Sequence, residues 1–124
     1  MPDPTTPPAK PLLRGVSHQV AFLLALGAGA FLITHATSTQ AMGAAWVYAA
    51  CMAAMFGISA LYHRRTWGEQ GRMRMRRLDH AAIFLMIAGS YTPIAALALP
   101  EASGSPLLSV MWALTVAAVL PPPL

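Results

Sequence analysis

Charged residues are scarce in this sequence. Of its 124 residues, only 10% are charged, whereas 56% are hydrophobic. A soluble domain usually carries about 25% charged residues, so a chain this poor in charge cannot cover a water-facing surface. The length would suit one small domain, but the composition excludes an ordinary soluble one.

Cysteine is nearly absent as well, because Cys51 is the single cysteine. A disulfide framework within one chain is therefore excluded, and we interpret Cys51 as a small packing residue. A secretory signal peptide is not indicated either. The first apolar run is too long for one, and no small-residue cleavage site ends it.

Three long stretches contain no charged residue: 15–63, 80–100 and 102–124. Uncharged apolar stretches of about 18 residues or more can cross a bilayer as helices. Strands are not indicated, since period-2 alternation is absent and lipid cannot satisfy an open backbone. We therefore predict an all-α, polytopic transmembrane bundle with about four spans, the first uncharged stretch holding two of them.

The predicted spans cover approximately residues 18–36, 41–62, 81–99 and 106–120. The polar turn THATSTQ joins the first two, which should run antiparallel. Residues 1–12 are rich in proline and are predicted to form a disordered cytoplasmic tail, and residues 13–124 form the transmembrane domain. Four glycines are expected to let helices approach closely: Gly27, Gly29, Gly43 and Gly57.

Positive charges gather in two places. Lys10 and Arg14 precede the first span, and six arginines lie in a predicted loop between the second and third: Arg64, Arg65, Arg72, Arg74, Arg76 and Arg77. Cytoplasmic loops carry an excess of Lys and Arg, and two crossings separate the clusters. Both should therefore face the cytoplasm from an inner membrane, with the N-terminus cytoplasmic and membrane lipids as partners. The alternative, an arginine patch for RNA or DNA, is disfavoured because the patch is short and adjoins apolar spans.

Four polar side chains are predicted to meet at one membrane depth. His18 opens the first span, His63 closes the second and Asp79 opens the third, while Ser59 lies one turn before His63 on the same helix face. Ionisable groups at the edge of the hydrocarbon usually face the bundle interior. Neutral imidazoles and a carboxylate suit zinc, and a nearby Asp could deprotonate a zinc-bound water.

Each of these residues also has a simpler interpretation. His18 and His63 could lie in the headgroup region without a ligand. Asp79 could cap the N-terminus of the third span, and Ser59 could bond back to its own helix. Two further histidines are expected elsewhere: His35 at the opposite membrane face and His80 about 100° around the helix from Asp79.

The motifs resemble those of a known family. SALYH at 59–63, a basic segment, and LDHAAIFLMIAGSYTP at 78–93 resemble the central signature of the hemolysin III family. RGVSH at 14–18 is similar to its first-helix motif, and PLLSVMWALTVAAVL at 106–120 to its fourth helix. This family is the bacterial branch of the adiponectin and progestin receptor (PAQR) proteins, within a wider group of membrane hydrolases that includes alkaline ceramidases.

The resemblance implies seven helices and an intramembrane zinc near the cytoplasmic side. It implies that His63 is a zinc ligand, that Asp79 and Ser59 lie near the zinc-bound water, and that His18 belongs to the same polar group. We therefore predict Asp79 and Ser59 as catalytic residues and His63 and His18 as metal-binding ones. The implied reaction is hydrolysis of a lipid amide or ester by zinc-bound hydroxide. A non-enzymatic protein, membrane-perturbing (pore-forming, cytolytic) or receptor-like, is the alternative.

The sequence departs from the family pattern in two ways. It has Arg14 and Gly15 where the family has acidic and Asn residues before the first histidine. The remaining family ligands come from a His-x-x-x-His pair on the seventh helix, and this sequence contains no such pair. We therefore expect an incomplete zinc site, a chain that is a fragment, and little or no turnover by this chain alone.

Overall fold

The structure is a computed structural model that describes residues 3–6 and 11–120. Four α-helices follow one another: α1 (Val16–Thr34), α2 (Thr39–Arg64), α3 (Glu69–Pro93) and α4 (Glu101–Val119), with a π-helical segment η1 (Ile94–Ala98) that continues α3. All four are long and apolar enough to cross a membrane. The predicted all-α fold with four spans is confirmed.

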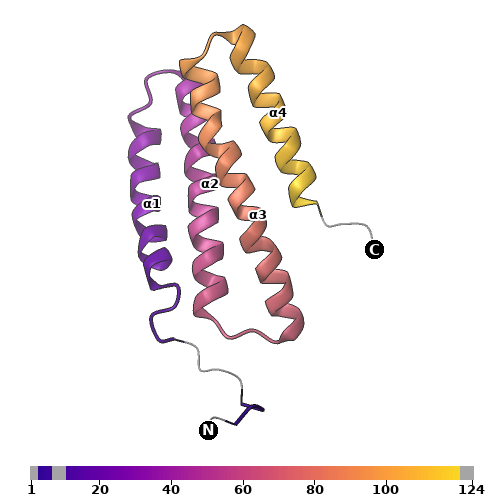
Figure 1. Ribbon diagram of the computed structural model, residues 1–124. Coiled ribbons are helices and arrows are strands. Elements are labelled where there is room, and N and C mark those ends of the chain that lie inside the picture. The colour runs from indigo at the N-terminus through magenta and orange to yellow at the C-terminus, as the bar shows by residue number, and fades with distance from the viewer. Residues whose placement is uncertain (1–2, 7–10, 121–124) are drawn as a thin grey trace.

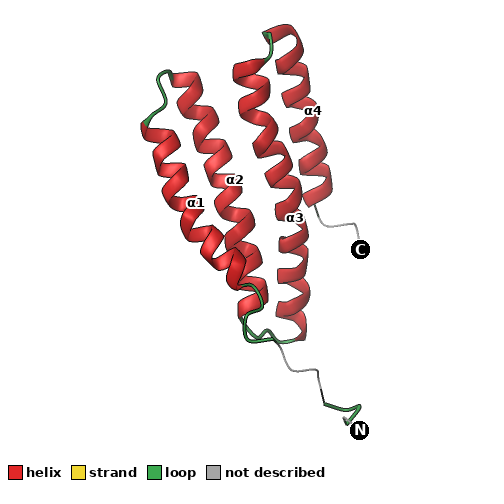
Figure 2. Ribbon diagram, turned by 60° about the vertical axis from the view of Figure 1, so that its left-hand side comes forward, coloured by secondary structure: helices red, strands yellow, loops and turns green. Residues whose placement is uncertain are grey.

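Consecutive helices lie side by side and run in opposite directions (Figure 1). α1 packs on α2, α2 on α3, and α3 on α4, and among these helices α1 contacts neither α3 nor α4. The described chain therefore forms an open layer one helix thick, seen from a second side in Figure 2. The start of α1, the end of α2 and the start of α3 lie at one end of this layer, which we call the basic end because Arg14 and Arg64 lie there.

Small side chains hold the layer together. The buried apolar residues are mostly alanines, and no large side chain is fully buried in the described part; they are Ala25, Ala44, Ala49, Cys51, Ala60, Met75, Ala82, Ala88 and Ala95. Many large apolar side chains point outward instead, as suits a protein whose solvent is lipid. The prediction that Cys51 is a packing residue is confirmed, since it is only 8% exposed.

The glycine predictions are half confirmed. A Cβ atom at Gly29 would lie 2.8 Å from Cβ of Ala49, and one at Gly57 would lie 3.0 Å from the Phe22 ring. These two glycines do allow close packing of α1 on α2. The prediction is wrong for Gly27 and Gly43, where an added Cβ would meet nothing within 4 Å.

Most of the basic stretch is helix and not loop, which corrects the prediction: Arg64 ends α2 and four of the other arginines lie in α3, whereas Arg65 lies in the connection. The connection between α2 and α3 is only residues 65–68, with Gly68 at the N-cap and Glu69 in the first turn. Glu69 suits the positive end of the helix dipole, and Arg and Met are good helix formers. Asp79 therefore lies about three turns inside α3, and the alternative that it caps the third span is wrong.

Proline affects the later helices. Pro93 lacks the N–H that an α-helix needs, and the chain continues beyond it as the π-helical η1. α4 begins at Glu101, five residues before the predicted start at Pro106, and its first turn is fixed by bonds from Ser103 N and Gly104 N to Pro100 O.

Half of the predicted disordered tail, residues 1–2 and 7–10, lies outside the described residues. Residues 3–6 form a turn in which the Thr5 hydroxyl and the Thr5 N–H both donate to the Asp3 carboxylate. These two hydrogen bonds lower the pKa of Asp3 from its ordinary value.

Candidate functional site

The last two turns of α2 carry the predicted site residues Ser59 and His63. Ser59 is buried, with 5% of its surface exposed, and it faces α1. Its Oγ forms a hydrogen bond of 2.5 Å with Nδ1 of His18. The edge of the His18 ring also meets the Phe56 ring, with 5.6 Å between centroids. Ser59 and His18 thus form one pair across the α1–α2 seam.

His63 and Asp79 form a second pair, across the α2–α3 seam. The Nε2 atom of His63 lies 3.9 Å from Oδ2 of Asp79, and the two side chains are 28% and 21% exposed. Both side chains of the pair are therefore partly buried. The four predicted side chains thus form two separate pairs, one on the α1–α2 seam and one on the α2–α3 seam.

Arg14 is a member of this cluster that the sequence reasoning did not assign. Its Nε donates a hydrogen bond of 2.9 Å to Nδ1 of His63, and its guanidinium lies over the Tyr62 ring at 5.9 Å from the centroid. Because an arginine Nε always carries a hydrogen, Nδ1 of His63 must be the acceptor. The proton of the neutral imidazole then lies on Nε2, which faces Asp79.

Gly15 makes this arrangement possible. It adopts φ +81°, a left-handed conformation that side chains disfavour, and a Cβ there would lie 2.7 Å from Cβ of His63. Next to it, Arg64 Nη1 donates to the Leu12 carbonyl at 2.6 Å. The segment before α1 is thus fastened over the end of α2. The sequence offered one signal for this contact, because Arg14 and Gly15 depart from the family pattern.

The side chains of the cluster are of the kinds that bind zinc, but too few of them lie together. The described residues contain no group of three or more His, Cys, Asp or Glu side chains placed to hold a metal ion, whereas a catalytic zinc takes three protein ligands and a water. Ligation through Nε2 of His63 also needs a lone pair where the Arg14 contact places a proton. The described arrangement does not form a zinc site by itself, and the metal-binding roles of His63 and His18 stay predictions.

Two other histidines lie apart from the cluster. His35 follows α1 at the opposite end of the layer, where its ring stacks on Phe31 with 4.0 Å between centroids. This agrees with its predicted place at the other membrane face. His80 donates from Nδ1 to the Arg76 carbonyl at 2.7 Å and lines a groove beside α4, so it points away from the Asp79 pair.

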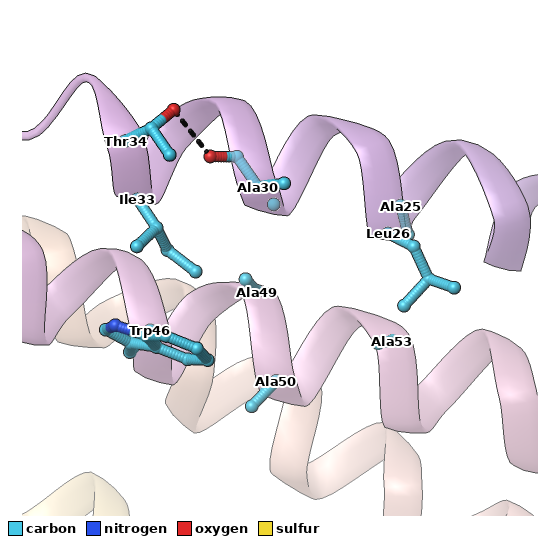
Figure 3. Close-up of a pocket in the computed structure, with 10 residues that line it drawn as sticks. Ala25, Leu26, Ala30, Ile33, Thr34, Trp46, Ala49, Ala50 and Ala53 are labelled. Carbon is cyan, nitrogen blue, oxygen red and sulfur yellow. Dashed lines mark hydrogen bonds between the residues drawn. The ribbon is translucent and has the colours of Figure 1, made fainter.

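An apolar cavity of about 380 Å³ lies between α1 and α2, away from the cluster. Figure 3 shows Trp46, Leu26 and Ile33 around it, with alanines between them. The Thr34 hydroxyl at its edge donates to the Ala30 carbonyl at 2.8 Å. The cavity offers no titratable group, so it brings no chemistry to the cluster.

Comparison with known proteins identifies the family. The sequence model described as "Haemolysin-III related" matches residues 8–122. Hemolysin-3 of Bacillus cereus is 30% identical over 112 residues, which are 88% of this chain and 51% of that protein. The Hemolysin-3 homolog of Bacillus subtilis (strain 168) is 28% identical over 115 residues, 88% of this chain and 52% of the relative.

The chain thus spans about half the length of these relatives. No solved structure matches it. The family model covers nearly the whole sequence, and it spans all four helices and both pairs of the polar cluster. The chain is a membrane protein with several apolar helices, and it belongs to the haemolysin-III related family.

Proposed function

We propose that this chain contributes part of a membrane-embedded, zinc-dependent hydrolase site directed at a lipid amide or ester. The observation that supports it is the pairing of His63 Nε2 with Asp79 Oδ2 at 3.9 Å across the α2–α3 seam. Ionisable groups within membrane helices are costly and commonly mark functional sites. His63 lies in the last turn of α2, and Asp79 lies about three turns inside α3. In this proposal that level is close to the lipid amide and ester groups.

In this proposal Asp79 accepts the proton of the attacking water, because a carboxylate beside an imidazole is suited to general base catalysis. His63 is the proposed metal ligand of this chain, and zinc would supply charge stabilisation and an acidified water. Ser59 holds the imidazole of His18 through its 2.5 Å bond. The remaining ligands would come from outside the described residues.

Zinc binding by the detergent-purified chain tests the metal part. Competition with a chromophoric chelator should show a weak site that His63→Ala abolishes. His35→Ala is the matched control, because it removes an imidazole from the opposite end of the layer. Equal zinc binding by His63→Ala and the parent chain, or equal loss in the control, would contradict the assignment.

A lipid-hydrolysis assay tests the enzymatic part. Ceramide and phospholipid ester substrates in proteoliposomes should be turned over by Hemolysin-3 of Bacillus cereus in a chelator-sensitive way, and far more slowly by this chain. Turnover by this chain at the rate of the longer relative would show that its site is already complete. A chelator-resistant relative would end the zinc-dependent proposal.

A membrane-perturbing function is the second candidate. It is favoured by the names of the two relatives and by the open layer, one helix thick, whose polar pairs lie on helix seams. Release of a trapped dye from vesicles would test it. Leakage that rises with protein concentration and survives Asp79→Asn would favour this candidate over the hydrolase.

We further propose that the basic end faces the cytoplasm from an inner membrane. The support is that Arg14, at the start of α1, and the arginines of α3 lie at the same end of the layer, so a positive-inside bias acts on both in the same direction.

A further inference from the structure

A groove of about 610 Å³ runs between the first half of α3 and the last turn of α4. It shares no lining residue with the His63–Asp79 pair. Its α3 side carries Arg76, Arg77 and His80, and its apolar lining includes Phe84 and Val119. No role in the polar cluster accounts for this concentration of basic groups.

Along α3 the groove lining begins with Met73, and from Arg76 onward it changes from basic to apolar. Arg76, His80 and Phe84 recur every four residues and so share one face of α3, with Arg77 on the neighbouring stripe. From Arg76 to Phe84 the helix rises by about 12 Å. Cationic groups therefore lie toward the end of the span and an aromatic ring lies deeper, which is the order of a lipid headgroup and its acyl chains.

The two arginines are available to a ligand. Arg76 and Arg77 are exposed, and no carboxylate of the described residues forms an ion pair with either. His80 uses Nδ1 as a donor to the Arg76 carbonyl at 2.7 Å. Its Nε2 is then left to accept a hydrogen bond, for example from a hydroxyl of a glycerol headgroup.

We propose that this groove binds an anionic glycerophospholipid, with its phosphate between Arg76 and Arg77 and an acyl chain along Phe84 and Val119. Guanidinium groups match phosphate oxygens in charge and geometry, and basic pockets between membrane helices suit anionic headgroups. A zwitterionic lipid carries an ammonium group that the two arginines repel. The proposal stands apart from the polar cluster and from the hydrolase.

Native mass spectrometry of the detergent-purified chain tests it, with phosphatidylglycerol, phosphatidylcholine and soluble glycerol phosphate as probes. The double variant Arg76→Gln/Arg77→Gln should weaken phosphatidylglycerol binding by about tenfold or more, as expected for two charge-assisted contacts. Arg72→Gln/Arg74→Gln is the matched control. It removes the same charge from the same helix, outside the groove, and should change binding by less than about threefold.

A second variant acts through shape and leaves the charge unchanged. Ala118 lines the groove on α4 and is exposed, so Ala118→Trp should fill the acyl-chain part and weaken phosphatidylglycerol binding with both arginines intact. Equal losses in the two arginine double variants, or equally tight phosphatidylcholine, would overturn the proposal. Glycerol phosphate bound as tightly as the lipid would show a free-anion site, which also overturns it.

Discussion

Arg14 Nε donates a hydrogen bond to Nδ1 of His63 across 2.9 Å, which joins the segment before α1 to the last turn of α2. This contact decides which nitrogen of His63 carries the proton, because the arginine can only donate. It also directs Nε2 at Asp79. Arg14, in the segment before α1, thereby determines whether Nε2 of His63, the nitrogen that faces Asp79, carries a proton.

The first prediction concerns that tautomer. In Arg14→Gln the fixed donor is lost, so His63 should change from a single Nε2–H tautomer to a mixture. Nitrogen-15 chemical shifts of selectively labelled histidine would report the change, and zinc should bind more tightly to the variant because Nε2 can then offer its lone pair. A parent protein whose His63 carries its proton on Nδ1 would contradict the assignment.

The second prediction concerns Gly15. Replacing it with Ala forces a side chain into a conformation at φ +81° and places a Cβ 2.7 Å from Cβ of His63. Left-handed backbone costs an L-residue about 1–2 kcal/mol, so Gly15→Ala should lower the unfolding free energy in detergent by at least about that much. A titration with SDS, followed by circular dichroism, would measure it.

Gly27→Ala is the matched control for that change. Gly27 lies within α1, and a Cβ there meets nothing within 4 Å. Because Ala favours a helix interior over Gly by about 0.5–1 kcal/mol, the control should be neutral or slightly stabilising. If both variants were equally stable, the contact of Gly15 with α2 would not constrain the fold.

The third prediction concerns the seam that holds the His63–Asp79 pair. A Cβ at Gly89 would lie 2.5 Å from Cβ of Cys51, so Gly89→Ala should push α3 away from α2. Overpacking of this kind costs about 1–3 kcal/mol. Cys51→Gly removes the atom that is struck, so the double variant should regain part of the loss. The same SDS titration measures this rescue. If the double variant were no more stable than Gly89→Ala, the clash with Cys51 would not be the cause of the lost stability.

The part of the fold that could be predicted from the sequence is the part that the bilayer dictates. The uncharged stretches must supply helices of bilayer length, so the existence and order of four helices could be read directly. The ends of these helices could not be predicted, because charged residues are taken to indicate a loop. Arg72 and Arg76 lie in helix α3, since arginine is a good helix former and its long stem can extend toward the membrane surface.

The candidate site was predictable where it depended on local spacing. Ser59 and His63 are one turn apart, and α2 does present both to the cluster. The role of Arg14 was not predictable, because it depends on the left-handed turn at Gly15 and on close packing against α2. Neither the turn nor the packing leaves a periodic signal. The two pairs likewise depend on how the seams pack.

The last prediction tests which side of the membrane the basic end faces. Single cysteines at Arg72 in α3 and at Thr37 in the turn between α1 and α2 would mark the two ends of the layer. Both positions are exposed, and Cys51, which is buried, can be replaced by Ala in the background.

An impermeant maleimide applied to intact spheroplasts should label the cysteine at position 37, whereas the cysteine at position 72 should react only after the membrane is disrupted. The physical reason is that Arg14 and the arginines of α3 share one end, and translocation of that end would carry all of them across. Labelling of position 72 in intact spheroplasts would place the basic end outside. In that case the His63–Asp79 pair would face the opposite leaflet, and a cytoplasmic hydrolase site would be ruled out.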